Sequence, residues 1–209
     1  MNTNTEKETL KELREIQKNT DNWKNNIGRV ASLLSECESV NVRAKALWIL
    51  GEMGLRYPQE VKVHVAEIAG YLDDDHPKLR ERALNALGRI GRADMNPVLP
   101  YFERLFEMAD DREGNVRLSF VWACENMANN APEIFCEKLD LFFELICDSN
   151  ERVRIEAPEM FRVMGKRMPE CVRPYLERLD YISKHDEHPV VRVHCQGAVR
   201  VTNNAFKNS

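Results

Sequence analysis

The chain has 209 residues, of which 43% are hydrophobic and 31% are charged, and its formal net charge is −4. This acidic balance argues against a dedicated nucleic-acid coat protein or an anionic-membrane binder, although it is compatible with a local basic face. The start of the chain is polar, and no apolar run approaches the roughly 18 residues that a membrane helix needs. We therefore expect a cytoplasmic protein that does not enter a membrane.

The six cysteines are scattered along the chain with no CxxC pair. Several fall on apolar stripes, where cysteine behaves as a small hydrophobic side chain. We expect reduced thiols, as in cytoplasmic proteins, and neither a metal ion nor a cofactor, because no closed ligand set is apparent. The cysteines are Cys37, Cys124, Cys136, Cys147, Cys171 and Cys195.

Apolar residues at helical spacing predict helices throughout, and no strand-like alternation appears. The first helix, over residues 5–18, has a charged remainder that suits an end cap. Five helical hairpins are predicted after it, over residues 21–54, 58–91, 97–128, 132–165 and 169–204. The last helix, 189–203, is apolar over more than one stripe, so we expect it to contact the polar tail of the chain, a second copy or a partner. The oligomeric state stays open.

The stretch 74–91 shows the signals of a second helix most clearly. Asp74 or Asp75 is predicted to cap its start, and Pro77 suits its first turn. Gly88 is expected to let another backbone come close, and Gly91 to end the helix in the left-handed conformation.

An arginine preceded by an apolar residue recurs in this part of every hairpin at a spacing of 37 or 38 residues, and aspartate stands six places before it four times. A fixed period in this range indicates stacked supersecondary units that share one core. The arginines are Arg43, Arg80, Arg117, Arg154 and Arg192. We expect them to bridge to acidic residues of adjacent repeats.

The pattern of aspartate, Val-Arg, two alanines, Leu-Gly and Ile-Gly resembles the second helix of a HEAT repeat, particularly the short prokaryotic kind. The resemblance covers nearly the whole chain. It implies an all-α, right-handed α-solenoid of about five hairpins, forming a single domain over residues 1–209. It does not fix the function, because such repeats occur in scaffolds, lyases, hydroxylases and DNA glycosylases alike.

In that family the second helices line the concave side, where ligands usually bind. Positions at fixed offsets from the repeated arginine are expected to face this side, and large aromatic rings there are typical binding anchors. The candidate partner-binding residues are Trp48, Arg82, Asn85, Arg89, Trp122 and Asn126. Each also has a structural interpretation: the indoles could pack over neighbouring repeats, and the arginines could form ion pairs. The resulting hypothesis is a non-enzymatic scaffold that binds a protein partner.

The alternative is a DNA-binding protein related to the HEAT-like alkylpurine DNA glycosylases. Trp122 followed by Asn126 resembles their Trp/Asp pair without its carboxylate, which a site that stabilises a departing cationic base requires. Trp48 with Glu52 has the spacing and an acid, but in a different repeat. We therefore expect no catalytic residues and no enzyme activity. Nucleic acid is the less favoured partner, because the chain is net negative.

Overall fold

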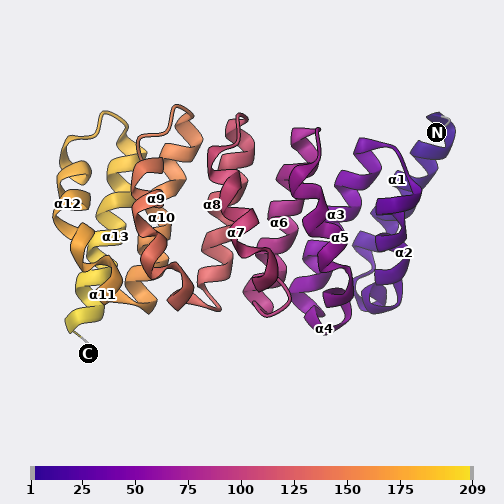
Figure 1. Ribbon diagram of the computed structural model, residues 1–209, viewed down its shortest axis with the longest axis horizontal. Helices are drawn as coiled ribbons and strands as arrows, with labels where there is room; N and C mark the ends of the chain where they lie inside the picture. Colours follow the sequence, from indigo (N-terminus) through magenta and orange to yellow (C-terminus); the bar gives the residue numbers. More distant parts are fainter. Residues whose placement is uncertain (1–2, 208–209) are drawn as a thin grey trace. The chain divides into compact units, whose positions relative to one another are not determined.

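A computed structural model describes residues 3–207 (Figure 1). Helices account for the regular structure of this range, and it contains no strand, so the all-α prediction is confirmed. The helices form two compact units that divide inside helix α8, between Ala123 and Cys124. A single domain over the whole chain stays a prediction, and each unit is described by itself.

The first unit begins with α1 (Thr3–Lys18), the predicted capping helix, and continues with paired helices. In order, these are α2 (Trp23–Glu36), α3 (Val40–Arg56), α4 (Pro58–Val61), α5 (Val65–Gly70), α6 (Pro77–Ala93), α7 (Phe102–Phe106) and the first part of α8 (Gly114–Ala128). In the second unit the end of α8 is followed by α9 (Leu139–Leu145), α10 (Glu151–Arg167), α11 (Pro169–Val172), α12 (Leu176–His185) and α13 (Pro189–Lys207).

The first helices of several hairpins are interrupted by 3₁₀ turns, whereas the second helices are long and regular. Two of these turns, at 99–101 and 173–175, contain Pro100 and Pro174. Proline cannot donate the hydrogen bond that a continuous α-helix needs, so the chain tightens into a 3₁₀ turn there. The regular second helices pack on one another, α3 against α6 in the first unit and α10 against α13 in the second.

Glycines allow these second helices to approach closely. A Cβ on Gly88 would lie 2.6 Å from the Cα of Ala123, and one on Gly51 would lie 2.8 Å from the Cα of Ala86. The predicted role of Gly88 is therefore confirmed. The predicted stop at Gly91 is wrong, because α6 runs through it to Ala93 and no glycine among residues 3–207 has a positive φ.

The start of α6 also differs from its prediction. The imidazole of His76, rather than an aspartate, caps the helix by accepting a hydrogen bond from the Lys78 amide at 3.2 Å. Asp74 instead accepts a hydrogen bond from the His76 amide at 2.8 Å, which closes the turn before the helix.

The repeated arginines bind two segments at once. In the first unit, Arg80 donates to the Asp74 carbonyl of its own hairpin at 2.8 Å and forms a two-point ion pair with Asp111 of the next, at 2.6 and 2.9 Å. Their side chains are only 9% and 7% exposed. Burial alone raises the pKa of Asp111, but the bonds from Arg80 and the Glu113 amide outweigh it and the net pKa is lowered.

The second unit repeats this arrangement. Arg154 pairs with Asp186 at 3.2 Å, and Arg192 donates to the carbonyl of the same Asp186 at 2.6 Å. Arg43 departs from it, since its Nε is buried without a hydrogen-bond partner among the described residues. The expected bridges to adjacent repeats are therefore present for Arg80 and Arg154.

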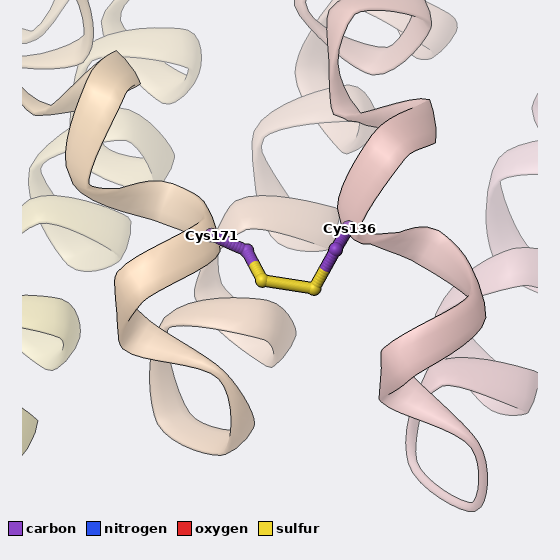
Figure 2. Close-up of a disulfide and its surroundings, with 2 residues drawn as sticks. All are labelled: Cys136 and Cys171. Atoms are coloured by element: carbon purple, nitrogen blue, oxygen red, sulfur yellow. A yellow bond between two sulfur atoms is a disulfide. The ribbon is translucent and has the colours of Figure 1, made fainter.

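A disulfide joins Cys136, in the 3₁₀ segment Pro132–Lys138, to Cys171 of α11 (Figure 2). The prediction of reduced thiols is wrong for this pair. The residues stand 35 positions apart, close to one repeat, so they occupy neighbouring places in successive hairpins, with Cα atoms 5.3 Å apart. Stacking of the repeats thus brings together cysteines that are distant in the sequence.

The other four cysteines are not part of a disulfide, and three of them are buried and one is exposed. Burial raises the pKa of Cys124 well above its ordinary value and that of Cys195 to about 12. These thiols stay protonated and act as core side chains, as their place on apolar stripes predicts. Cys147 is the exposed one.

Glu125 is a half-buried residue of the second unit. Its Oε1 is buried without a hydrogen-bond partner among the described residues. Burial, followed by the negative charges of Glu156 and Glu159, raises its pKa from 4.5 to about 8, and only Arg162 acts in the opposite direction. Glu125 is therefore mostly protonated at neutral pH.

Helix α13 buries Val191, Cys195 and Ala198, while Val190 and Val193 are 39% and 63% exposed. The predicted contact surface at 189–203 thus has apolar side chains in solvent, but what covers it stays a prediction. None of the helices within residues 3–207 combines the length and the apolar character needed to traverse a lipid bilayer.

Replacing Gly88 with alanine should destabilise the protein by about 1–3 kcal/mol, because the new Cβ forces α6 away from the α8 backbone. Gly28 of α2 provides a matched control, since its added Cβ meets nothing within 4 Å. Gly28→Ala should stabilise by roughly 0.5–1 kcal/mol through helix propensity. Urea unfolding measures both, and equal stability of the two variants would contradict the close approach.

Replacing Glu125 with glutamine should remove a pH dependence of stability. Because the folded pKa of about 8 exceeds the ordinary 4.5, the folded state holds a proton that the unfolded chain has released. Glu125 therefore makes the free energy of unfolding fall between these pH values, with a slope approaching roughly 1.4 kcal/mol per pH unit. Urea unfolding from pH 5 to 9 should show a flatter profile for Glu125→Gln than for the parent. The control variant Glu144→Gln, at an exposed position, should have the same pH profile of stability as the parent. A profile of Glu125→Gln parallel to that of the parent would refute the raised pKa of Glu125.

Thiol counting tests the disulfide. A maleimide reagent should label Cys147 in the folded protein, four thiols in the unfolded unreduced chain, and all six cysteines after reduction, because Cys136 and Cys171 are oxidised. Intact mass spectrometry after labelling reads the number directly. Six labels without reduction, in protein prepared with oxygen present, would show that the bond does not form.

Candidate functional site

The second helices of the first unit present a row of half-buried side chains at the predicted offset. Trp48 stands on α3, Asn85 on α6 and Trp122 on α8. Asn85 connects two of these helices, because its amide donates to the hydroxyl of Ser119 at 3.1 Å as well as to the Glu81 carbonyl at 2.9 Å. One hydrogen bond of Asn85 thus links α6 to α8, the helix that carries Trp122.

Trp48 lies among cations. The ammonium of Lys45 is 4.7 Å from the centre of its ring, and the guanidinium of Arg89 is 6.0 Å away. Both separations fall within the range of cation–π attraction. Arg89 is also paired with Glu52 at 2.6 Å and donates to the Asn85 carbonyl at 3.2 Å. The positive charge of Arg89 is therefore largely neutralised within the protein.

An open hollow of about 310 Å³ lies beside the Trp48 ring. Helices α1, α3 and α6 supply its walls, and three of the side chains that line it are cationic. The lining residues are Leu10, Asn41, Ala44, Lys45, Trp48, Lys78 and Arg82. The hollow thus combines an aromatic ring and aliphatic groups with positive charge, a composition suited to ligand binding.

The cations of the hollow have few acidic partners. Lys45 donates to the side-chain oxygen of Gln17, and Lys78 donates to Asn41 at 3.0 Å. Arg82 is 3.6 Å from Glu81. Burial, followed by the nearby charges of Arg14 and Arg82, lowers the pKa of Lys45. The positive charges therefore repel one another without full compensation.

The structure brings together four of the six predicted residues on α3 and α6. Trp48 and Arg82 line the same hollow, Arg89 lies near the Trp48 ring, and Asn85 stands between the two arginines on α6. Trp122 is half-buried on the following helix, α8. Asn126 lies one turn further along α8, in the second unit, and its part in a site stays a prediction.

Two acidic residues lie near the tryptophans along the chain. The acid that follows Trp48, Glu52, is bound to Arg89, and Glu125, near Trp122 in sequence, is buried beside other acidic groups. Among residues 3–207, no group of three histidine, cysteine, aspartate or glutamate side chains is placed to hold a metal ion.

The residues predicted from the sequence omit two features of the structure. Leu10 reaches the hollow from the capping helix, and Lys45 and Lys78 complete its charge. Lys45 and Arg82 stand at the same offset from the repeated arginine, so the periodicity could have indicated Lys45 as well. Glu125 occupies the offset from the repeated arginine at which the earlier repeats have Gly51 and Gly88. A charged residue at a glycine position could have indicated from the sequence that this carboxyl group is unusual.

A family model described as HEAT repeats matches residues 29–105. No curated protein matches the chain. Among solved structures, it is similar to an engineered protein at 17% identity, with 97% of this chain and 94% of that chain covered and a TM-score of 0.71. It is also similar to a designed armadillo repeat protein in complex with the peptide (KR)4, at 19% identity, 97% and 96% coverage and a TM-score of 0.68. Computationally designed armadillo repeat proteins for modular peptide recognition match at 17% identity, 96% and 95% coverage and a TM-score of 0.63.

At these identities the structural likeness shows the fold, which is that of an α-solenoid. The family model, the 37-residue period and the helical hairpins agree with one another. Residues 29–105 therefore resemble HEAT repeats, and the chain has an α-solenoid fold.

Proposed function

We propose that this protein is a non-enzymatic scaffold that binds a partner protein on the face formed by the second helices of its repeats. The fold is typical of protein-binding scaffolds. The observation that carries the proposal is Trp48, which is half-buried at the side of an open hollow rather than enclosed in the core. By contrast, Trp23 is 8% exposed and its indole N–H donates to the Ile16 carbonyl, as expected of a structural tryptophan.

The proposed contact residues differ in whether their side chains already form bonds within the protein. Trp48 and Trp122 would anchor the partner, since a partly exposed ring gains contact area at small entropic cost. Arg82 would supply charge, because it lines the open hollow and its ion pair with Glu81, at 3.6 Å, is long. Asn85 and Arg89, which have bonds within the protein, would hold the surface in place and add hydrogen bonds. Asn126 is proposed as a further contact on α8.

A protein partner fits this surface better than DNA. The similar designed proteins include one in complex with a peptide and others made for peptide recognition. For the DNA alternative, the tryptophans would need a free carboxylate and extended phosphate contacts. The pairing of Glu52 with Arg89 removes the former near Trp48. We propose accordingly that the protein has no catalytic function of its own.

Replacing Trp48 and Trp122 together with alanine should weaken binding of the partner by at least about tenfold, since two anchors are removed. Partners are identified by affinity capture from the source organism with quantitative mass spectrometry, and the purified pair is then measured by calorimetry. Tyr181→Ala is the matched control, because this ring is 63% exposed on α12, a first helix. Equal partner binding by the double variant and the control, with both folded by circular dichroism, would refute the proposed face.

A further inference from the structure

The hollow on the first unit has an excess of positive charge. Lys45, Lys78 and Arg82 line it from two neighbouring helices, and none of its lining residues is acidic. The exposed Arg14 of α1 is close enough to Lys45 to act on it electrostatically. Two acids stand at the rim: Glu81 near Arg82, and Glu6, which accepts a hydrogen bond from Asn41 at 3.2 Å.

The interactions of the two lysines leave their charges uncompensated. Lys45 and Lys78 donate to the neutral side chains of Gln17 and Asn41, and neither forms an ion pair with the described residues. Burial lowers the pKa of Lys45, and the nearby positive charges of Arg14 and Arg82 lower it further. An anion in the hollow would convert this repulsion into attraction.

The apolar part of the hollow restricts the ligand further. Trp48 and Leu10 line it together with the cations, so a group bound there would contact an indole and an aliphatic side chain as well as ammonium and guanidinium groups. A small inorganic anion would use only the charges. A segment that alternates carboxylates with apolar side chains would use both.

We infer that this hollow binds an acidic peptide segment of a partner protein, in which carboxylates reach Lys45, Lys78 and Arg82 while an apolar side chain packs on Trp48 and Leu10. The inference rests on the proposed scaffold function and names the chemical class of the partner. It assigns to the first unit a preference for acidic segments, which the fold by itself does not specify.

The extent of the positive surface favours a short acidic peptide over a nucleic acid. A second hollow shares Lys78 and Arg82 but is also lined by Glu81 and Glu113. On the other side, Arg89 is neutralised by Glu52. A nucleic acid, which gains affinity by contacting several phosphates in succession, would meet carboxylates within one repeat in either direction. A peptide needs the charge only where its acidic side chains lie.

The inference is tested on the full chain by fluorescence anisotropy at low ionic strength, where charge pairs are least screened. Three fluorescein-labelled probes are compared: a peptide of alternating glutamate and leucine, the matching peptide of lysine and leucine, and a short oligothymidylate. We expect the acidic peptide to bind most tightly. The double variant Lys45→Gln/Arg82→Gln should weaken its binding by about tenfold or more, since two charge contacts are lost.

The matched control is Lys62→Gln/Arg112→Gln, which removes the same charge from exposed sites outside the hollow and should leave the affinity within about twofold of the parent. Thermal unfolding verifies that both double variants fold. Tighter binding of oligothymidylate, absence of binding by the acidic peptide, or equal loss in the two double variants would each overturn the inference. If an identified partner binds through Trp48 and Trp122 but is unaffected by Lys45→Gln/Arg82→Gln, the acidic preference fails while the scaffold function stands; if neither set of changes matters, the scaffold face itself is wrong.

Discussion

The bond that connects an arginine of one hairpin to an aspartate of the next fixes how these repeats stack. Arg80 shows why the pattern needs both residues, because its guanidinium is almost fully buried and would be costly there without the Asp111 carboxylate and the Asp74 carbonyl. The aspartate also has a second role. Asp111 accepts a hydrogen bond from the amide of Glu113 and so shapes the loop before α8. One residue thus sets the turn of its own hairpin and the position of the preceding one. The same pairing at Arg154 and Asp186 gives the second unit its own copy of this constraint.

Close helix contact imposes a second constraint, and it determines which positions remain for binding. Where Gly51 and Gly88 meet the backbone of the next second helix, no larger side chain fits without movement. The positions three places earlier, Trp48 and Asn85, lie on an adjacent face that stays partly exposed. Because the closest contact with the next repeat uses the glycine side of each helix, the neighbouring face has room for larger side chains such as that of Trp48. Function in such a fold is therefore expected on that face.

Periodicity made most of the fold predictable from the sequence. Constant offsets locate the hairpins, the arginine–aspartate bonds and the candidate binding face, because each of these repeats with the stacking. The His76 cap and the Cys136–Cys171 disulfide escaped prediction for other reasons. His76 stands four places before the repeated arginine, where Ser39, Asn150 and His188 also accept from helix amides, but the aspartates nearby were the more usual capping residues. The separation of the two cysteines is close to one repeat, but only the distance between the two hairpins shows that they are bonded. Likewise, the sequence does not reveal the ion pairs of Arg82 and Arg89. Arg89 is 2.6 Å from Glu52 of the preceding repeat, whereas Arg82 is 3.6 Å from its neighbour Glu81 and lines the hollow.

Glu125 and Lys45 illustrate two outcomes of placing a charge among like charges. Glu125 is buried beside Glu156 and Glu159, and its pKa rises to about 8, so it avoids repulsion by holding a proton at neutral pH. Lys45 borders an open hollow, where its ammonium is accessible to solvent, although burial and the charges of Arg14 and Arg82 lower its pKa. Such a lysine keeps the capacity to attract an anion, whereas the buried carboxyl has lost the capacity to attract a cation. Solvent access, rather than the number of like charges, therefore decides which cluster can serve in recognition. By this criterion the cationic hollow of the first unit is suited to binding, and the acidic cluster of the second is a cost to stability that grows with pH.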